Sequence, residues 1–398
     1  MKGPLVCMLS AAHPPADVRV VGKEGAALAD AGWAVLHLCP RPAGQDASAP
    51  LREAAGAAPA AGVPASHAGV AIQTYARAPG WRGRLRNIPP LARRAAATGA
   101  GVLHASEPDA WLAALLAARR SGARVVLDVH EHYPSRLDSR LPPRLRPLGR
   151  AALRLVCRLA GRAADAVVVA KDGLDADFGV PARTVAVRNY AAAVPVAPRQ
   201  HRPGPVTLLH LGALGRARGA GEMLDALSLC PAGTRLRLIG RFTDGSEPEF
   251  MARAAALRLA GAVEHHGWMP HAEALAAAAQ ADIGLVLFQP GVENHRLALP
   301  HKLFDCMLAG LPVIAPAFAE EVAAIIREAG CGLLVDSADA GAVAGAVARL
   351  ADPALRAEMG ARGRAAALGR FGWAGEAARL VALYRRLAPL PAPLIASE

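Results

Sequence analysis

Aromatic side chains are scarce in this chain. Its 398 residues include seven phenylalanines, five tryptophans and four tyrosines, which together make 4% of the sequence. Proteins that bind single-stranded nucleic acids without sequence preference stack successive bases on aromatic rings. We therefore expect no nucleic-acid partner of that kind, although the chain carries a formal net charge of +12.

Two further features are missing from the sequence. No run of about 18 apolar residues is present, so no transmembrane helix is expected, and the short apolar run after Lys2 does not resemble a secretory signal. The six cysteines are scattered without a C-x-x-C pair. This usage is typical of a reduced, cytoplasmic protein without a metal cluster.

Acidic residues are few in one half of the chain only. Residues 1–193 contain 25 lysines and arginines against 14 acidic residues, a net charge of +11. Residues 194–398 contain 20 and 19, a net charge of +1. The charge asymmetry indicates an anionic partner for the first half alone.

What the sequence does contain is a repeated alternation of short apolar runs and helical patterns. The apolar runs are typical of parallel strands that are buried on both faces. The alternation stops at residues 191–206, which hold four prolines and a glycine, and then starts again. We predict an α/β protein with two doubly wound, Rossmann-like domains over residues 1–193 and 207–370, joined by a linker over 194–206, with ligands in the cleft between them.

The most informative segment is LPHKLFDCMLAGLPVIAP, residues 299–316. Pro300 suits the first turn of a helix, and Gly310 suits its C-terminal cap. The free N–H groups at such a helix start attract anions, and Lys302 adds a cation that a helix alone disfavours there. Asp305, one turn further, can accept hydrogen bonds from hydroxyls. The pattern fits a phosphate beside a sugar diol, and it also fits a solvated Lys–Asp pair at i, i+3 spacing.

The longer segment ENHRLALPHKLFDCMLAGLPVIAP, followed by EAGCGLLVDSAD, closely resembles the C-terminal signature of family 4 glycosyltransferases of the GT-B fold. The pieces HPPADVRVVGKEGAALADAG, VVLDVHEHYP, ADAVVVAKDGL and RFGWAGEAARLVALYRRL extend the resemblance along the chain. It implies an acceptor-side domain, a donor-binding domain that faces it across a cleft, and a final helix over 371–390 that returns toward the first domain.

The resemblance also implies a reaction. Enzymes of this family use a nucleotide diphosphate sugar as donor and retain the configuration of the transferred sugar. We expect a glycan, a lipid-linked or a small-molecule acceptor, as in polysaccharide biosynthesis, and no metal or other cofactor.

Roles follow from the resemblance residue by residue. It implies catalytic roles for His130, Arg218 and Lys302. It implies acceptor-side contacts for Asp17, Arg19 and Glu131. The residues that it places at the donor are Gly212, Arg216, Gly240, Trp268, Glu293, Asn294, Leu299, Pro300 and Asp305.

The chain departs from the family pattern at two places. Where the family usually has two glutamates eight positions apart, this chain has Leu297 and Asp305. We expect backbone amides near residues 297–299 to meet the sugar or diphosphate, and Asp305 to bind the ribose hydroxyls. Ala213 stands where an arginine is common, and Arg218 stands at the lysine position; Arg216 is the nearest residue that could compensate for Ala213.

Other chemistry has less support. The glycines of HLGALGRARGAG do not match the G-x-G-x-x-G spacing of a dinucleotide site, whereas a close approach of the backbone to a diphosphate explains them. His265 and His266 are adjacent without a third ligand, which argues against zinc. Three alternatives stay open: a sugar-nucleotide 2-epimerase, an inactive subunit that binds nucleotide sugars, and nucleic-acid binding by the basic N-terminal domain.

Arginines concentrate between residues 136 and 162. The segment contains eight arginines, mostly four residues apart, and a single acidic residue, Asp138. Leucines lie between the arginines. Prolines at 142, 143 and 147 restrict a continuous helix to about residues 148–164. We hypothesise that this segment, with the arginines at 82–94, docks the protein on an anionic membrane at its inner face. An ordinary solvated helix face is the alternative.

Overall fold

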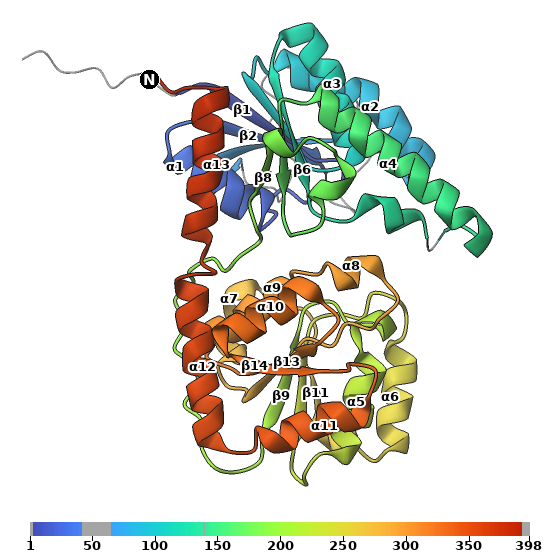
Figure 1. Ribbon diagram of the computed structural model, residues 1–398, viewed down its shortest axis with the longest axis vertical. Helices are drawn as coiled ribbons and strands as arrows, with labels where there is room; N and C mark the ends of the chain where they lie inside the picture. The colour runs from blue at the N-terminus through green and yellow to red at the C-terminus, as the bar shows by residue number, and fades with distance from the viewer. Residues whose placement is uncertain (1–2, 42–64, 139, 392–398) are drawn as a thin grey trace, which may run out of the picture. The chain divides into compact units, whose positions relative to one another are not determined.

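The computed structural model describes residues 3–41, 65–138 and 140–391 (Figure 1). The chain divides into two compact units, Met1–Arg188 with Ala374–Glu398, and Asn189–Trp373. We call them the N-terminal and the C-terminal domain. Each contains a parallel or largely parallel sheet with helices on both faces, which confirms the predicted α/β class with two doubly wound domains.

The N-terminal domain is built on an eight-stranded sheet with the order β3-β4-β2-β1-β5-β6-β7-β8. Neighbouring strands are parallel except for β3 and β4. The strands are β1 Leu5–Leu9, β2 Ala34–Pro40, β3 Ser66–His67, β4 Val70–Tyr75, β5 Val102–Ala105, β6 Arg124–Val129, β7 Ala166–Val169 and β8 Thr184–Ala186.

Helices cover both faces of this sheet, with α2, α3 and α4 on one side and α1 and α13 on the other (Figure 1). The final helix is fixed to this domain by hydrogen bonds from Tyr384 to His104 (2.8 Å) and from the Trp33 indole to the Ala388 carbonyl (3.0 Å). The helices are α1 Ala26–Asp30, preceded by a π-helical turn Val20–Gly25, α2 Gly80–Ala97, α3 Pro108–Ser121, α4 Arg146–Ala163 and α13 Trp373–Leu387.

The C-terminal domain has a six-stranded, all-parallel sheet with the order β11-β10-β9-β12-β13-β14. Its strands are β9 Thr207–Leu211, β10 Arg235–Ile239, β11 Val263–His265, β12 Ile283–Leu285, β13 Val313–Pro316 and β14 Gly332–Val335. Its helices are α5 Ala220–Leu229, α6 Glu247–Ala256, α7 His271–Ala278, α8 Glu293–Arg296, α9 His301–Leu308, α10 Glu320–Ala329, α11 Ala340–Arg349 and α12 Pro353–Leu368.

Each face of the C-terminal sheet has its own apolar core. Helices α7, α9 and α10 cover one face, where Phe304 packs with Leu209. Helices α5, α6 and α11 cover the other, where Leu224 and Val347 pack with Leu208. Neighbouring residues of β9 reach opposite cores because successive side chains of a strand point to opposite faces. The helix predicted between Pro300 and Gly310 is α9, whose apolar face closes the first of these cores.

The segment predicted as a linker, residues 194–206, contains no helix or strand before Thr207 and packs against the C-terminal domain. The His201 imidazole is hydrogen-bonded to the Gly310 carbonyl (2.9 Å), and Arg199 forms an ion pair with Asp282 (3.0 Å). The Arg356 guanidinium donates to the Arg202 carbonyl (2.8 Å). The structure divides the chain at 188/189, five residues before the predicted boundary.

Two local predictions need adjustment. The alternation of apolar runs gave no strand at Val70–Tyr75, because this edge element carries Gln73 and Thr74 among its apolar residues. The arginine-rich helix begins slightly earlier than predicted, at Arg146, because Pro147 occupies the first turn, where a missing N–H costs nothing.

Candidate functional site

The C-terminal sheet reverses its strand order at β9, which lies between β10 and β12. In doubly wound sheets, ligands bind beyond the carboxyl ends of the strands at such a point. Four residues gather there: His210 in β9, Gly212 directly after it, Phe288 after β12, and Lys302 in the first turn of α9. We take these residues as the centre of the candidate site.

Glycines are required where the backbones of β9 and β10 end. Gly240 has a φ of 152°, and a Cβ atom there would lie 1.8 Å from the Gly212 carbonyl oxygen. Gly212 itself has a φ of 86°. At the other end of the same turn, Gly219 has a φ of 80°, and a Cβ there would lie 2.3 Å from the Leu287 carbonyl oxygen. The turn 212–219 therefore lies directly against the chain at the ends of β10 and β12, the two strands on either side of β9.

Lys302 is half-buried, and its Nζ lies 2.9 Å from His210 Nε2. Burial of the amine and the nearby positive charge of Arg218 lower the pKa of Lys302 from 10.5 to about 7. Lys302 therefore exchanges its proton near neutral pH in the ligand-free domain.

Phe288 brings Arg218 and Lys302 together. The Arg218 Cζ lies 4.9 Å from the centroid of the Phe288 ring, and the Lys302 Nζ lies 5.9 Å from it. Cations are attracted to the face of an aromatic ring, which offsets part of their mutual repulsion. An arginine, a lysine and the start of α9 thus form a site suited to a polyvalent anion.

Asp305 lies one turn after Lys302 and is bound to a histidine. Its Oδ1 lies 2.9 Å from His271 Nε2, and its side chain is 14% exposed. The carboxylate therefore reaches solvent, and His271 fixes its orientation. Sequence reasoning had no reason to select His271, which comes from the start of α7.

Two other predicted donor residues lie outside the cluster. Arg216 is exposed and directs its guanidinium to Glu249 of α6, while its backbone N–H donates to Asp244 (2.8 Å). It therefore does not take the position left by Ala213. Trp268 is 64% exposed, with the Arg241 guanidinium 5.7 Å from its ring centroid, which leaves an open aromatic face after β11.

The remaining predicted donor residues surround the start of α9. Glu293 forms an ion pair with Arg296 (2.5 Å) within α8, and Asn294 is half-buried beside it. Leu299 is buried, and Pro300 precedes the first turn of α9 in an extended conformation. Leu297 is buried too, so neither leucine side chain is exposed to a ligand.

The N-terminal sheet has a reversal of its own, at β1 between β2 and β5. Glu107, which follows β5, accepts hydrogen bonds from three consecutive backbone N–H groups of the loop after β1. These belong to Ala11 (2.7 Å), Ala12 (2.9 Å) and His13 (3.2 Å). A single carboxylate thus fixes the loop that carries the predicted residues Asp17 and Arg19.

Two histidines meet beside this loop. The ring centroids of His13 and His130 are 4.9 Å apart in an edge-to-face arrangement. Burial alone would lower the pKa of His13, but the hydrogen bond to Asp17 (3.1 Å) and the charge of Glu107 raise it to about 9. Asp17 also accepts from the backbone N–H of Val20, so it caps the turn that follows.

His130 is anchored by Asp128, the last residue but one of β6. His130 Nε2 is hydrogen-bonded to the Asp128 carboxylate, which leaves Nδ1 as the nitrogen available to a ligand. Although burial opposes its ionisation, the charges of His130 and Arg19 hold the pKa of Asp128 well below its usual range. Asp128 is thus a buried anion that orients the imidazole.

Arg19 is buried inside the N-terminal domain. Its side chain is 6% exposed, and its guanidinium lies 2.6 Å from Glu24 and 3.1 Å from Asp128. The arginine neutralises two buried carboxylates, and its predicted acceptor-side contact stays a prediction. Glu131, in contrast, is partly exposed and forms an ion pair with Arg136 (3.0 Å).

The buried carboxylates also bear on metal binding. Among the described residues, Glu24, His104 and Asp128 form a group whose ligating atoms lie within 4.8 Å of one another. The Arg19 guanidinium already contacts both carboxylates, so it supplies the positive charge that a metal ion would bring. The donor set therefore does not favour a divalent cation while Arg19 keeps this position.

Sequence reasoning missed Phe288 and His271 in the C-terminal cluster. It also missed four polar residues near strand ends: His13, Glu107, Asp128 and His210. Each follows or ends an apolar run at a strand end, so the strand-end rule would have selected them once the strand order was known. Without that order, each reads as an ordinary polar residue at the end of a buried strand.

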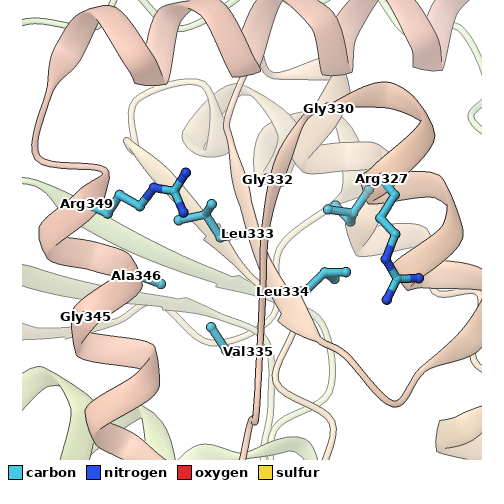
Figure 2. A pocket seen from close by; sticks show the side chains of 10 residues that line it. Arg327, Gly330, Gly332, Leu333, Leu334, Val335, Gly345, Ala346 and Arg349 are labelled. Carbon is cyan, nitrogen blue, oxygen red and sulfur yellow. The ribbon is translucent and has the colours of Figure 1, made fainter.

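A groove of about 500 Å³ lies elsewhere, along the edge strand β14 between α10 and α11. Figure 2 shows Arg327 and Arg349 on either side of this strand, with Leu333, Leu334 and Val335 along it. It includes none of the predicted site residues. We therefore assign the candidate site to the strand ends and not to this groove.

Two family models match the chain, one in each domain. Residues 18–189 match Glycosyltransferase Family 4, and residues 205–352 match Glycosyl transferases group 1. The second match includes the turn 212–219 and Lys302.

Relatives and solved structures agree with these matches. The D-inositol 3-phosphate glycosyltransferase of Acidothermus cellulolyticus is 31% identical over 171 residues, which are 42% of this chain and 36% of the relative, about a third of its length. The sucrose-phosphate synthase of Thermosynechococcus elongatus matches with a TM-score of 0.71 at 19% identity over 96% of this chain and 99% of that chain. Anabaena HepE in complex with UDP gives 0.66 at 16% identity, over 97% and 100%. These structures share the GT-B fold with this chain.

The contact between Gly240 and Gly212 predicts unequal effects for two glycine substitutions. Gly240→Ala would force a methyl group into the Gly212 carbonyl and should lower the free energy of unfolding by roughly 2–4 kcal/mol. The matched control is Gly245→Ala. Gly245 has a φ of 75°, but no atom lies within 4 Å of the position that its Cβ would take. This substitution should lower the free energy of unfolding by only about 1–2 kcal/mol. Urea unfolding of both variants provides the measurement, and equal losses would show that the turn adapts.

Proposed function

Because the chain belongs to glycosyltransferase family 4, we propose that it transfers a sugar from a nucleotide diphosphate donor to an acceptor hydroxyl, with retention of configuration. The observation that carries this proposal is the cluster of Lys302 and Arg218 around Phe288 at the strand ends of the C-terminal domain. Both cations lie beside the N-terminus of α9, where a diphosphate meets positive charge and free N–H groups.

The donor is a nucleoside diphosphate sugar. Anabaena HepE, which shares the fold, has been solved with UDP, with UDP and glucose, and with UDP-glucose. These complexes support a donor of the same class here. Asp305 accepts from the ribose hydroxyls, and the exposed face of Trp268 lies in the loop that receives the base.

In the proposed reaction the bond between the anomeric carbon and the diphosphate oxygen breaks, and a bond forms between that carbon and the acceptor oxygen. The acceptor proton passes to the departing phosphate oxygen. Arg218, Lys302 and the start of α9 stabilise the charge that develops on the diphosphate, so the step needs no metal. His130, oriented by Asp128, is a further proposed catalytic residue, through its Nδ1.

The acceptor belongs to the N-terminal domain in this proposal, and it is a glycan carried on a lipid. Helix α4 supports a membrane surface as the place of reaction. Leu148, Leu155 and Leu159 are each more than half exposed, and Val156 is 47% exposed. They share one side of the helix, whereas Cys157, Ala160 and Gly161 face the domain.

Arginines flank the exposed leucines of α4. Arg150 and Arg154 form ion pairs with Asp138 and Asp177, so part of the predicted charge is neutralised within the domain. Arg158 and Arg162 follow at the same spacing along one side of the leucines. An apolar stripe beside basic residues is typical of helices that lie in the plane of a membrane interface. None of the helices described has the length and apolarity to cross a bilayer.

Activity is tested by release of nucleoside diphosphate from a panel of nucleotide sugars, with and without acceptor glycans. A transferase releases the diphosphate and extends the acceptor. An epimerase would convert the donor without an acceptor, and a binding subunit would bind the donor without turnover. The last two outcomes overturn the proposal.

Lys302→Ala should lower kcat/KM, with a loss of transition-state stabilisation of roughly 2–4 kcal/mol, because it removes a charge-assisted donor at a developing anion. It should also weaken binding of inorganic pyrophosphate. Arg253→Ala, which breaks an exposed ion pair with Asp225 in the same domain, is the matched control. Steady-state kinetics that match between the Lys302 and Arg253 variants would remove Lys302 from the site.

Asp305→Asn should weaken binding of the nucleoside but not of pyrophosphate, because an amide oxygen is a weaker acceptor for hydroxyls than a carboxylate. Calorimetry with each ligand separates the two halves of the donor. A loss of pyrophosphate affinity equal to the loss of nucleoside affinity would show a general disturbance of α9 instead.

Membrane docking by α4 should be strong on anionic vesicles at low salt and weak at high salt, because salt screens the arginines. The double variant Leu155→Ser/Leu159→Ser keeps the charge and removes the apolar stripe, so it should sediment less with the same vesicles. Equal sedimentation with anionic and neutral vesicles would contradict docking, and the arginines would then form a solvated face.

A further inference from the structure

One ring nitrogen of His210 has two partners. His210 is 1% exposed near the end of β9. Its Nε2 lies 2.9 Å from Lys302 Nζ and 3.1 Å from the carbonyl oxygen of Ala213, in the turn 212–219. Its Nδ1 is buried without a hydrogen-bond partner. The imidazole therefore connects the lysine with the backbone of the turn.

The two contacts compete for the same nitrogen. When Nε2 carries the proton, it donates to the Ala213 carbonyl, and it cannot accept from a charged lysine. When Nε2 is unprotonated, it accepts from the Lys302 ammonium, but the Ala213 carbonyl loses its donor and Nδ1–H is buried without an acceptor. The first arrangement satisfies the backbone and favours a neutral Lys302.

The groups around Lys302 favour the same state. Arg218 repels a charged amine, while Asp305, which would attract it, is already bonded to His271. Burial raises the pKa of the Cys306 thiol to about 12, so that this thiol carries no charge at neutral pH. Burial and the charge of Lys302 hold the pKa of His210 well below its usual value, so the ring is neutral too.

We infer that His210 is a positioning residue of the donor site: its Nε2–H fixes the turn through Ala213, and because Nε2 cannot then accept from an ammonium, the Lys302 amine stays neutral beside Phe288 until an anion binds. This inference rests on the proposed function, because the anion is the diphosphate of the donor. When the anion arrives, Lys302 takes a proton from solvent and its ammonium turns to the phosphate oxygens. His210 keeps its bond to the turn throughout.

The direction of the pH dependence follows. Lys302 in the free domain has a pKa of about 7, and an adjacent anion raises it. Below pH 7 the lysine is already charged, and affinity for a nucleoside diphosphate changes little through this group. Above pH 7 binding takes up a proton, so Kd should rise by up to about tenfold per pH unit until the pKa of the complex is reached.

The chain offers a direct probe, because it contains only four lysines: Lys2, Lys23, Lys171 and Lys302. NMR of protein labelled with ¹³C at the lysine ε-carbons follows the titration of Lys302 without any ligand. The Lys302→Gln variant assigns its signal by removing it. The expected midpoint in the parent is near pH 7.

Two substitutions at His210 should move this midpoint in opposite directions. His210→Gln offers an N–H₂ group to Ala213 and a carbonyl oxygen to the ammonium at once, so the midpoint should rise by about one pH unit or more. His210→Leu places apolar atoms against the amine, so the greater desolvation should lower the midpoint. The turn also loses its donor to Ala213, so nucleoside diphosphate affinity should drop at every pH. Far-UV circular dichroism checks that each variant is folded.

His201→Gln is the matched control, because His201 also holds a backbone carbonyl of the same domain, that of Gly310. It should leave the Lys302 midpoint unchanged. An identical midpoint in the parent and both His210 variants would overturn the inference, even if the protein binds nucleoside diphosphates. Opposite shifts in a protein that binds no nucleoside diphosphate would support the role of His210 and refute the proposed function.

Discussion

A close approach of two backbone segments in the C-terminal domain sets the geometry of its site. The chain after β9 passes so near the end of β10 that position 240 has no room for a side chain beside the Gly212 carbonyl. Gly219 closes the same turn against β12. Since both ends of the turn are fixed by backbone contact, Arg218 is placed beside Lys302 before any ligand arrives.

This placement has an electrostatic cost. Two basic side chains lie at one strand end, and the nearest carboxylate, Asp305, is bonded to His271. The domain lowers the cost by burying the amine, which favours neutral Lys302, and by placing both basic groups near the Phe288 ring. An incoming anion favours the charged form of Lys302, so binding of a charged ligand is coupled to uptake of a proton above pH 7.

In the N-terminal domain, the charged groups at the strand reversal are carboxylates instead of two basic side chains. At its own strand reversal, Glu107 holds a loop by three backbone N–H groups, and Asp128 orients His130. Arg19 balances the buried carboxylates from within, and Tyr384 of the final helix joins the network through His104. Two sheets of the same type therefore carry different groups at their strand reversals: histidines with buried carboxylates in the N-terminal domain, and Arg218 and Lys302 beside His210 in the C-terminal domain.

The sequence by itself determined the elements. Apolar runs, Pro300 and Gly310 are local signals, and they predicted the doubly wound domains and helix α9 because periodicity and backbone conformation depend on neighbours in the chain. The roles predicted for Gly212, Gly240 and Lys302 follow from the resemblance to the family, which is also a property of the sequence. The partners were decided only by tertiary structure. Asp177 neutralises Arg154, Arg19 turns inward, and His210 reaches Lys302, because strand order brings together residues that are up to 109 positions apart.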